Sequence, residues 1–285
     1  MYQDRRVISV TPAGRKRYLE ILAPYLLRER GLIDKHIFWI NTNNEEDISY
    51  IKELCTCFPD FFEYRELPPG TEYSNYTIHN FFPECTDRNT IYIRLDDDIC
   101  WIDSDCILEL LKLRYDDHTS FIVYGNTINN AICSHLHARI GAMHLANGMP
   151  TYNCMCELGW RNSEYAKAVH INFLRKLEAQ ESDDYKFARE WILGVGETRM
   201  SINAISWHGG TFAKFEGKID RDEELDLSLI RPRDLKVITK IAGRALLCHF
   251  AFYTQRSYLE SVGILQKYSD ISAQLASDLG IILPK

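Results

Sequence analysis

The sequence predicts an α/β protein with a mostly parallel central sheet flanked by helices. Strand-like and helix-like segments alternate through the first 130 residues, which is the pattern that parallel β-α-β units require. The chain has 285 residues, of which 46% are hydrophobic, so a core of good size is available. No linker, internal repeat or change of composition divides it. We therefore expect one domain, residues 1–285, with an elaborated C-terminal part.

The first half should supply most of the parallel strands. RRVISVT (5–11) is rich in β-branched residues and is typical of a strand, and TPAG follows it as a tight loop. Residues 15–28 carry apolar side chains at helical spacing. The other elements expected before residue 130 are strands at 36–42, 61–67, 90–95 and 120–126, a helix at 46–57, and a short helix with Asp103 as its N-cap and Asp105 in its first turn.

The second half is less regular. A long helix is expected at 163–180, and a strand and loop region rich in Trp and Gly at 198–215. An acidic segment, IDRDEELDL (219–227), comes next. The chain then continues as an apolar strand at 244–253 and an amphipathic helix at 255–279.

Charge and apolar segment lengths exclude several classes of protein. The formal net charge is −7, which argues against a general nucleic-acid binder, because such proteins present a basic face. No segment approaches the roughly 20 apolar residues of a membrane-spanning helix, and the N-terminus lacks the apolar stretch of a signal peptide. We therefore expect a cytoplasmic protein without a transmembrane segment.

Nine cysteines are scattered through apolar contexts. Disulfide frameworks belong mostly to small secreted domains, so reduced and mostly buried cysteines are expected. Two C-x-C pairs, Cys55/Cys57 and Cys154/Cys156, are spaced more closely than the C-x₂₋₄-C pairs of structural zinc sites. This spacing does not favour a zinc site.

Three consecutive aspartates, Asp96, Asp97 and Asp98, lie between two apolar runs in IYIRLDDDICWID (91–103). Burying unpaired charge is unfavourable, so the triplet needs an explanation. In open parallel sheets, ligands bind beyond the carboxyl ends of the strands, which is where the triplet lies. In an extended chain, Asp96 and Asp98 project to one side and can bind Mg²⁺ or Mn²⁺. The alternative is a solvated acidic turn.

A strand that runs into D-x-D, in a chain whose first strand begins near the N-terminus, resembles the GT-A-fold nucleotide-sugar glycosyltransferases. VISVTPAGR (7–15) is similar to that family's opening strand and loop, and HFAF (249–252) to its late histidine segment. The chain also looks like small cytosolic glycosyltransferases of bacteria and large DNA viruses. The resemblance implies a GT-A, Rossmann-like fold, with a nucleotide-sugar-binding half at 1–130 and an acceptor-binding half with the C-terminal helix at 131–285.

The resemblance assigns a metal-binding role to three residues. Asp98 is expected to bind Mn²⁺ or Mg²⁺ directly, and Asp96 to face the ribose or to meet the metal through water. Asp97 is expected to orient Asp98 or to contact the sugar. His249 would be the late metal ligand, with its second ring nitrogen held by an acceptor. The alternative for His249 is a core histidine in an apolar strand.

The resemblance also implies a site for a nucleotide-diphosphate sugar, with UDP-sugar as the favoured donor. Arg15 is expected to reach the diphosphate, because Arg pairs well with phosphate; a solvated first-turn arginine is the alternative. Main-chain groups of residues 11–14 would read the base. Besides Asp96 and Asp97, the expected donor-site residues are Thr11, Pro12, Ala13, Gly14, Arg15, Asn41, Thr42, Asn80 and Arg94, although Asn41 and Thr42 are better explained as a turn.

An inverting enzyme needs a general base to deprotonate the acceptor hydroxyl. The acidic segment resembles the family's base-bearing helix start, which makes Asp222 or, in a shifted alignment, Glu224 the candidate; a solvated helix N-terminus is the alternative. SWHGG (206–210), with Trp207 and His208, is a candidate acceptor loop, although Trp207 could equally be core. Trp160 and Arg161 are further candidates for contact with a glycan or other hydroxyl acceptor.

Three other functions remain open. A sugar nucleotidyltransferase shares the α/β layout and the need for a metal, but TPAGRKR is only faintly similar to its Gly-rich basic loop. A two-metal phosphohydrolase would use the aspartates with His135, His137 and His249. A scaffold without catalytic activity would leave the aspartate triplet unexplained.

Overall fold

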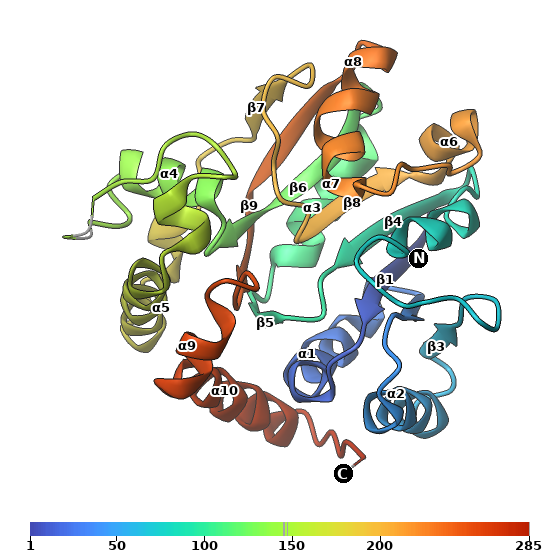
Figure 1. Cartoon of the computed structure of the whole chain (residues 1–285), viewed down its shortest axis with the longest axis horizontal. Helices are drawn as coiled ribbons and strands as arrows, with labels where there is room; N and C mark the ends of the chain where they lie inside the picture. Colours follow the sequence, from blue (N-terminus) through green and yellow to red (C-terminus); the bar gives the residue numbers. More distant parts are fainter. Residues whose placement is uncertain (145, 147, 285) are drawn as a thin grey trace.

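The computed structural model describes residues 1–144, 146 and 148–284. These residues form one nine-stranded sheet, ordered β3-β2-β1-β4-β8-β6-β9-β5, with β7 paired to β9 (Figure 1). The strands are β1 (Arg6–Ala13), β2 (Lys35–Ile40), β3 (Phe62–Arg65), β4 (Thr90–Leu95), β5 (Ile99–Ile102), β6 (Ser120–Ile128), β7 (Trp191–Gly194), β8 (Ala204–His208) and β9 (Ile238–His249).

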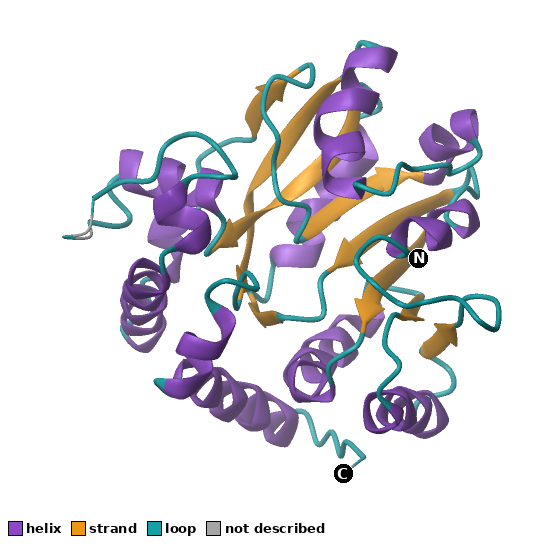
Figure 2. Cartoon of the chain, in the orientation of Figure 1, coloured by secondary structure: helices purple, strands orange, loops and turns teal. Residues whose placement is uncertain are grey.

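Six of these strands run in one direction. β1 is parallel to β2 and β4, β2 is parallel to β3, and β6 is parallel to β9. β8 is antiparallel to both β4 and β6, so β6 and its parallel neighbour β9 run in the same direction as β4. β5 and β7 are antiparallel to β9. Figure 2 shows the sheet flanked by helices. The predicted α/β class with a mostly parallel sheet is therefore confirmed.

Helices cover both faces of the sheet, because its strands are apolar on both sides. Val7 of β1 belongs to the core that also takes in α1, α3 and α10, whereas Ile8 belongs to a second core with α4 and α6. The helices are α1 (Lys16–Arg28), α2 (Glu45–Cys57), α3 (Cys106–Asp116), α4 (Ala131–Arg139), α5 (Ser163–Glu178), α6 (Gly209–Phe212), α7 (Glu223–Leu225), α8 (Arg231–Leu235), α9 (Arg256–Ser261) and α10 (Ile264–Asp278). Within the described ranges, none combines the length and apolarity needed to cross a membrane.

Several predicted boundaries were wrong. Thr11, Pro12 and Ala13 belong to β1 rather than to a loop; Pro12, which has no N–H, lies beyond Val10, where the pairing with β4 ends. The strand predicted at 244–253 begins at Ile238 and ends at His249. The single helix predicted at 255–279 is broken into α9 and α10 at Gly263, whose φ of 76° is left-handed.

The aspartate triplet also differs from its expected shape. The chain does not stay extended after Leu95 but turns through Asp97 and Asp98 into β5, a strand that the sequence did not predict. The following helix begins two positions later than expected, with Asp105 instead of Asp103 at its N-cap, while Asp103 accepts a hydrogen bond from the Asp105 amide. All nine cysteines are free thiols.

The carboxyl ends of the six co-directional strands lie at one edge of the sheet. From β1 the chain goes first to β2 and β3 on one side and then to β4 on the other, so β1 and β4 form the topological switch point. Ligands of open α/β sheets bind at such a point. The loop after β1, the turn after β4 and the last residue of β9 all lie at this edge, which therefore positions the candidate site.

Candidate metal centre at the carboxyl edge of the sheet

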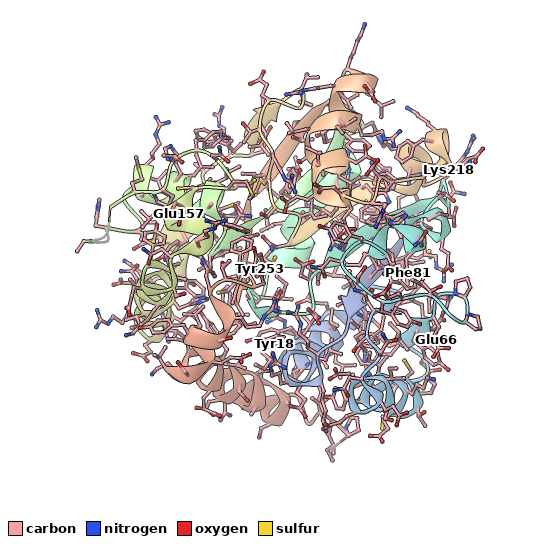
Figure 3. The ribbon with its side chains drawn as sticks, viewed as in Figure 1. Tyr18, Glu66, Phe81, Glu157, Lys218 and Tyr253 are labelled. Carbon is pink, nitrogen blue, oxygen red and sulfur yellow. The ribbon has the colours of Figure 1, made fainter. Side chains whose placement is uncertain are left out.

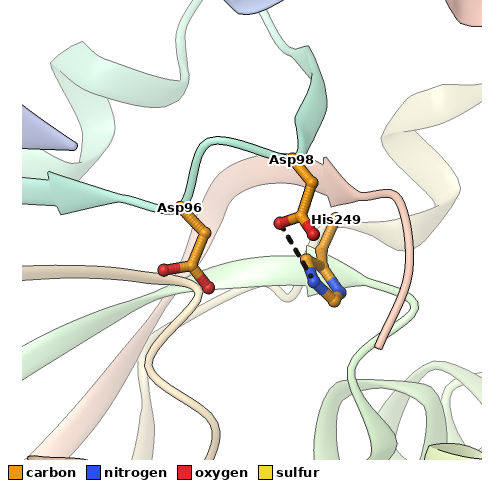
Figure 4. Close-up of side chains that lie close together, drawn as sticks. All are labelled: Asp96, Asp98 and His249. Atoms are coloured by element: carbon orange, nitrogen blue, oxygen red, sulfur yellow. Dashed lines mark ion pairs between the residues drawn. The ribbon is translucent and has the colours of Figure 1, made fainter. Parts of the chain in front are cut away.

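Asp96, Asp98 and His249 come together at this edge (Figure 4). Each offers one ligand atom, and the three atoms lie within 4.8 Å of one another. In the part of the chain that the structure describes, this is the one group of three such side chains. Asp98 and His249 are almost completely buried, and Asp96 is partly exposed. The strand ends bring together two carboxylates and an imidazole that are far apart in sequence.

The imidazole of His249 is held from both sides. Its Nδ1 lies 3.4 Å from the carbonyl oxygen of Asn129, and its Nε2 lies 3.3 Å from Asp98 Oδ1. A carbonyl oxygen can only accept, so Nδ1 carries a proton and Nε2 faces the carboxylate. Burial lowers the pKa of His249, but the neighbouring Asp98 carboxylate outweighs burial and raises its pKa overall. Nε2 therefore carries either a proton or a cation.

Asp98 is surrounded by positive charge. Its Oδ2 lies 3.2 Å from Nη2 of Arg15 and 3.2 Å from Nη2 of Arg256. Both guanidinium groups also lie over the ring of Tyr18, at 4.9 and 5.9 Å from its centroid. Burial would raise the pKa of Asp98, but the arginine and histidine charges hold its pKa below the ordinary range. Asp98 is therefore ionised.

Asp96 lies in a different environment. Its Oδ1 is 2.9 Å from Nη2 of Arg94, and its Oδ2 accepts a hydrogen bond of 3.1 Å from the side-chain amide of Asn203. Burial raises the pKa of Asp96, and the nearby Asp98 charge adds to this, although Arg94 opposes both. Asn203 is in turn oriented by Asn130, whose amide donates to its Oδ1 at 3.1 Å. Both oxygens of Asp96 thus have fixed directions.

Asp97 faces the loop after β1 instead of the cluster. Its Oδ2 accepts from the Gly14 amide at 3.2 Å and from Arg15 Nε at 3.0 Å, and its Oδ1 accepts from Arg15 Nη2. The paired contacts with one guanidinium group form a bidentate ion pair. Asp97 therefore connects the β1 loop to the turn after β4. The two roles expected from the sequence were to orient Asp98 or to contact the sugar, and this connection is neither of them.

The expected donor-site residues divide into two groups. Thr11 is fully buried, and its hydroxyl has no hydrogen-bond partner among the described residues. Gly14 lies so close to Asn41 that a Cβ at Gly14 would be 3.0 Å from the Asn41 carbonyl oxygen. These residues line the end of β1. By contrast, Thr42 accepts from the Asn44 amide and Asn80 donates to the Thr77 carbonyl, so both act as turn residues.

Three neighbouring acids of the acidic segment, Asp222, Glu223 and Glu224, point in different directions. Asp222 caps α7, and Asp222 and Glu224 both bind Arg199, at 3.0 and 2.7 Å. Glu223 is the member that points inward, and its Oε1 lies 2.9 Å from Arg94 Nη2, the same nitrogen that contacts Asp96. Burial raises the pKa of Glu223 to about 7. Sequence analysis did not single out Glu223.

Trp207 and His208 lie away from the cluster. β8 is antiparallel to β4, so His208 pairs with Ile91 at the start of β4, while Ala204 pairs with Leu95 at its end. Trp207 is fully buried and stacks on Tyr92, with ring centroids 5.6 Å apart. The SWHGG segment is therefore part of the core at the opposite edge, and its predicted place in an acceptor loop needs correction.

The other histidines proposed as metal ligands are also separate from this group. His135 contacts the carbonyl of Pro150 through Nδ1 at 2.8 Å, and His137 contacts the side-chain oxygen of Asn126 through Nε2 at 2.7 Å. Burial lowers the pKa of His137 to about 3, as for a neutral core histidine. Both histidines stabilise α4, and neither joins Asp96 and Asp98.

Three residues at the site were not predicted from the sequence: Arg256, Asn203 and Glu223. Arg256 begins α9, seven positions after His249, and no local pattern distinguishes it from a surface arginine. Asn203 precedes β8, and only the antiparallel pairing with β4 brings it to Asp96. A search for polar residues directly before or after each strand of the sheet would have identified Asn203.

No protein-family model and no curated protein sequence matches the chain. Similar solved structures include a 4-diphosphocytidyl-2C-methyl-D-erythritol synthase (11% identity, 92% of this chain, 98% of that chain, TM-score 0.44). A CMP:2-keto-3-deoxy-manno-octonic acid synthetase in complex with CTP is similar at 11% identity (94% and 99% coverage, TM-score 0.46). TarS 1–349 of S. aureus is similar at 9% identity (94% and 65%, TM-score 0.48). With TM-scores below 0.5, these similarities assign no function to the chain.

Proposed function

We propose that the protein is a metal-dependent glycosyltransferase that moves a sugar from a UDP-sugar to a hydroxyl group of a glycan or related acceptor. The observation that carries this proposal is the group of Asp96, Asp98 and His249 at the carboxyl edge of the sheet. The group lies beside the β1–β4 switch point, and Arg15 and Arg256 flank it. Such a site suits a ligand that carries both a nucleoside and a diphosphate.

The donor atoms fit a divalent cation. Two carboxylates supply the hard oxygen ligands that Mn²⁺ and Mg²⁺ prefer, and His249 adds one nitrogen. Because Mg²⁺ is usually held by oxygen ligands alone, the histidine favours Mn²⁺. When bound, the ion would stabilise the negative charge that gathers on the leaving diphosphate. Asn129 would keep His249 Nε2 directed at the ion.

Arg15 and Arg256 would bind the diphosphate. Each guanidinium group is partly exposed, with a side-chain exposure of 25%, and each contacts only one oxygen of Asp98. A cation on Asp98 would neutralise that carboxylate and leave Arg256 to pair with phosphate oxygens, while Arg15, which stays paired with Asp97, would offer the phosphate its remaining N–H groups. The end of β1, from Thr11 to Gly14, would face the nucleoside, with Asn41 beside it.

A general base in the acidic segment would complete an inverting mechanism. Asp222 and Glu224 were predicted for this role, but each is paired with Arg199, and Asp222 also caps α7. Glu223 carries a free oxygen, Oε2, and its pKa of about 7 suits a group that takes up a proton near neutral pH. We assign the base role to this segment, with Glu223 as its best-suited member.

The experiment is a thermal-shift panel of UDP-, GDP- and CMP-sugars, each with and without Mn²⁺. A ligand that binds the native state raises its melting temperature by mass action. We expect the largest shift with UDP-sugar and Mn²⁺ together, followed by slow Mn²⁺-dependent release of UDP in the absence of an acceptor. If no nucleotide sugar shifts the melting temperature with metal present, the proposal fails.

The same samples separate glycosyl transfer from nucleotidyl transfer. A sugar nucleotidyltransferase would join a nucleoside triphosphate to a sugar phosphate and release pyrophosphate, whereas a glycosyltransferase releases the nucleoside diphosphate. We expect UDP release from UDP-sugar and no pyrophosphate from UTP with sugar 1-phosphate. Pyrophosphate release that requires Asp98 would replace the proposed activity with nucleotidyl transfer.

A further inference from the structure

Two aromatic rings form a corner at the same edge of the sheet, beyond β9 and on the opposite side of β4 from β1. Tyr253, four residues after His249, is 68% exposed, and Figure 3 labels it near the middle of the face in view. The ring of Trp160 lies 5.5 Å from that of Tyr253, centroid to centroid, at an interplanar angle of 76°. One ring thus stands nearly at right angles to the other.

Backbone contacts place the two rings next to each other. Trp160 lies in η3 (Glu157–Arg161), a single π-helical turn of a kind often found at functional sites. Gly159 packs so closely on α4 that a Cβ there would be 2.7 Å from the Cβ of Ala131. The Thr254 hydroxyl donates to the Trp160 carbonyl at 2.8 Å. This hydrogen bond joins the turn that carries Tyr253 to the π-helical turn that carries Trp160.

A chain of buried hydrogen bonds connects the corner to the candidate metal centre. The carbonyl of Asn129 accepts from His249 Nδ1, and the side-chain amide of Asn129 donates to Gln255 Oε1 at 3.1 Å. Gln255 Nε2 then donates to the Gly159 carbonyl at 3.3 Å. Gln255 is fully buried, so it is a structural link between β9 and η3. The corner therefore has a defined position relative to His249.

We propose that Trp160 and Tyr253 form the subsite that receives a sugar ring of the acceptor. Aromatic faces bind the apolar C–H face of a pyranose, and Tyr253, which is 68% exposed, leaves most of its ring free to receive one. Arg161 lies over the Trp160 ring at 5.1 Å and pairs with Glu157 at 3.6 Å, so donors and acceptors for sugar hydroxyls lie at the rim. This proposal rests on the proposed function and names its acceptor as a carbohydrate.

The experiment is binding of the labelled full-length protein, with UDP and Mn²⁺, to a printed array of glycans. We expect native protein to retain a subset of glycans and Tyr253→Ala to bind that subset about tenfold more weakly, the loss of one aromatic contact of about 1.4 kcal/mol. Tyr253→Phe should bind as native does, because the ring face and not the hydroxyl makes the contact. Tyr64→Ala, on β3 at the far end of the sheet, is the matched control.

Three results would overturn the subsite: no glycan retained by native protein, equal retention by Tyr253→Ala, or a loss of UDP affinity in Tyr253→Ala with glycan retention intact. The last result would mean that the ring stacks on the nucleoside. Mn²⁺-dependent turnover of UDP-sugar by native protein tests the proposed function separately. Glycan retention that depends on Tyr253 without any turnover would support the subsite and remove the transferase assignment.

Discussion

The two carboxylates of the candidate metal centre, Asp96 and Asp98, are two residues apart, but they have different arginine partners and their pKa values shift in opposite directions. Asp98 contacts Arg15 and Arg256, whose side chains are 25% exposed, and its pKa lies below the ordinary value. Asp96 contacts Arg94, whose side chain is only 4% exposed, and its pKa is raised by burial. The two arginines beside Asp98 are therefore more exposed than the arginine beside Asp96.

This difference suggests a division of labour. Asp98 would carry the charge that binds the cation, while its arginines turn to the diphosphate. Asp96 would supply direction, because Arg94 and Asn203 hold both of its oxygens. This difference can be tested by substituting Asp98 and its partner Arg256, and then Asn203 and Glu223 on the Asp96 side. The effects of these substitutions should decrease in that order.

The largest effect is expected for Asp98→Asn. The variant keeps the shape of the side chain but loses the ionised ligand, so Mn²⁺ affinity should fall by about a hundredfold or more. Mn²⁺ binding is followed by electron paramagnetic resonance, and UDP release from UDP-sugar is measured beside it. Asp116→Asn, at the exposed end of α3, is the control. Unchanged Mn²⁺ affinity in Asp98→Asn would contradict the metal assignment.

Arg256→Gln should have the next largest effect, and on turnover rather than on metal binding. The variant removes one donor to the leaving diphosphate, which typically lowers the rate by about a hundredfold. Arg17→Gln, on α1 and paired with Glu260, serves as the matched control. Equal turnover in the two variants would show that Arg256 only neutralises Asp98.

On the Asp96 side, Asn203→Ala should weaken Mn²⁺ binding by about tenfold, because it frees one oxygen of Asp96 without removing a ligand. The same Mn²⁺ titration measures the change. Asn89→Ala, near the start of β4, provides a comparison at the opposite edge of the sheet. A loss as large as that of Asp98→Asn would remove the distinction between the two carboxylates.

The smallest effect concerns pH. Burial raises the pKa of Glu223 from 4.5 to about 7, so its protonated form favours the folded state. The stability that this group contributes is fully present below pH 4.5 and is lost as the pH rises through 7. In metal-free protein, the melting temperature of Glu223→Gln should therefore fall less than that of native protein between about pH 5 and pH 8, by a few degrees.

Glu157→Gln, an exposed position in η3, is the control for this pH series. Parallel melting curves for native protein and Glu223→Gln across the range would mean that Glu223 is ionised in the fold. Glu223 would then no longer be favoured over its neighbours Asp222 and Glu224 as the general base.

Sequence patterns predicted the parallel half of the molecule well, because each strand and helix there is a local pattern of apolar residues. Asp96 and Asp98 were predicted from their place after an apolar strand, whereas His249 joined them only through the resemblance to GT-A-fold glycosyltransferases. The partners of Asp96 were not predicted. Asn203 reaches it only through the antiparallel insertion of β8 between β4 and β6, and no local pattern in one chain reports strand order.

Strand arrangement also explains why Trp207 was wrongly predicted to lie in an acceptor loop. An aromatic residue beside two glycines is consistent with a sugar-binding loop, but the direction of β8 decides at which edge it lies. Tyr253 shows the opposite case. The apolar run 244–253 predicted a buried strand to its end, whereas β9 stops at His249 and leaves Tyr253 exposed.

Arg256 lies 158 positions after Asp98, its ion-pair partner. During synthesis, a chain that has emerged only as far as α5 therefore contains the aspartate triplet and Arg15 but neither His249 nor Arg256. Until β9 is inserted next to β6, Asp98 has Arg15 beside it but lacks His249 and Arg256, two of its three basic partners. The candidate centre is thus among the last parts of the molecule to assemble, and a newly made chain would gain its affinity for metal only once nearly the whole fold is complete.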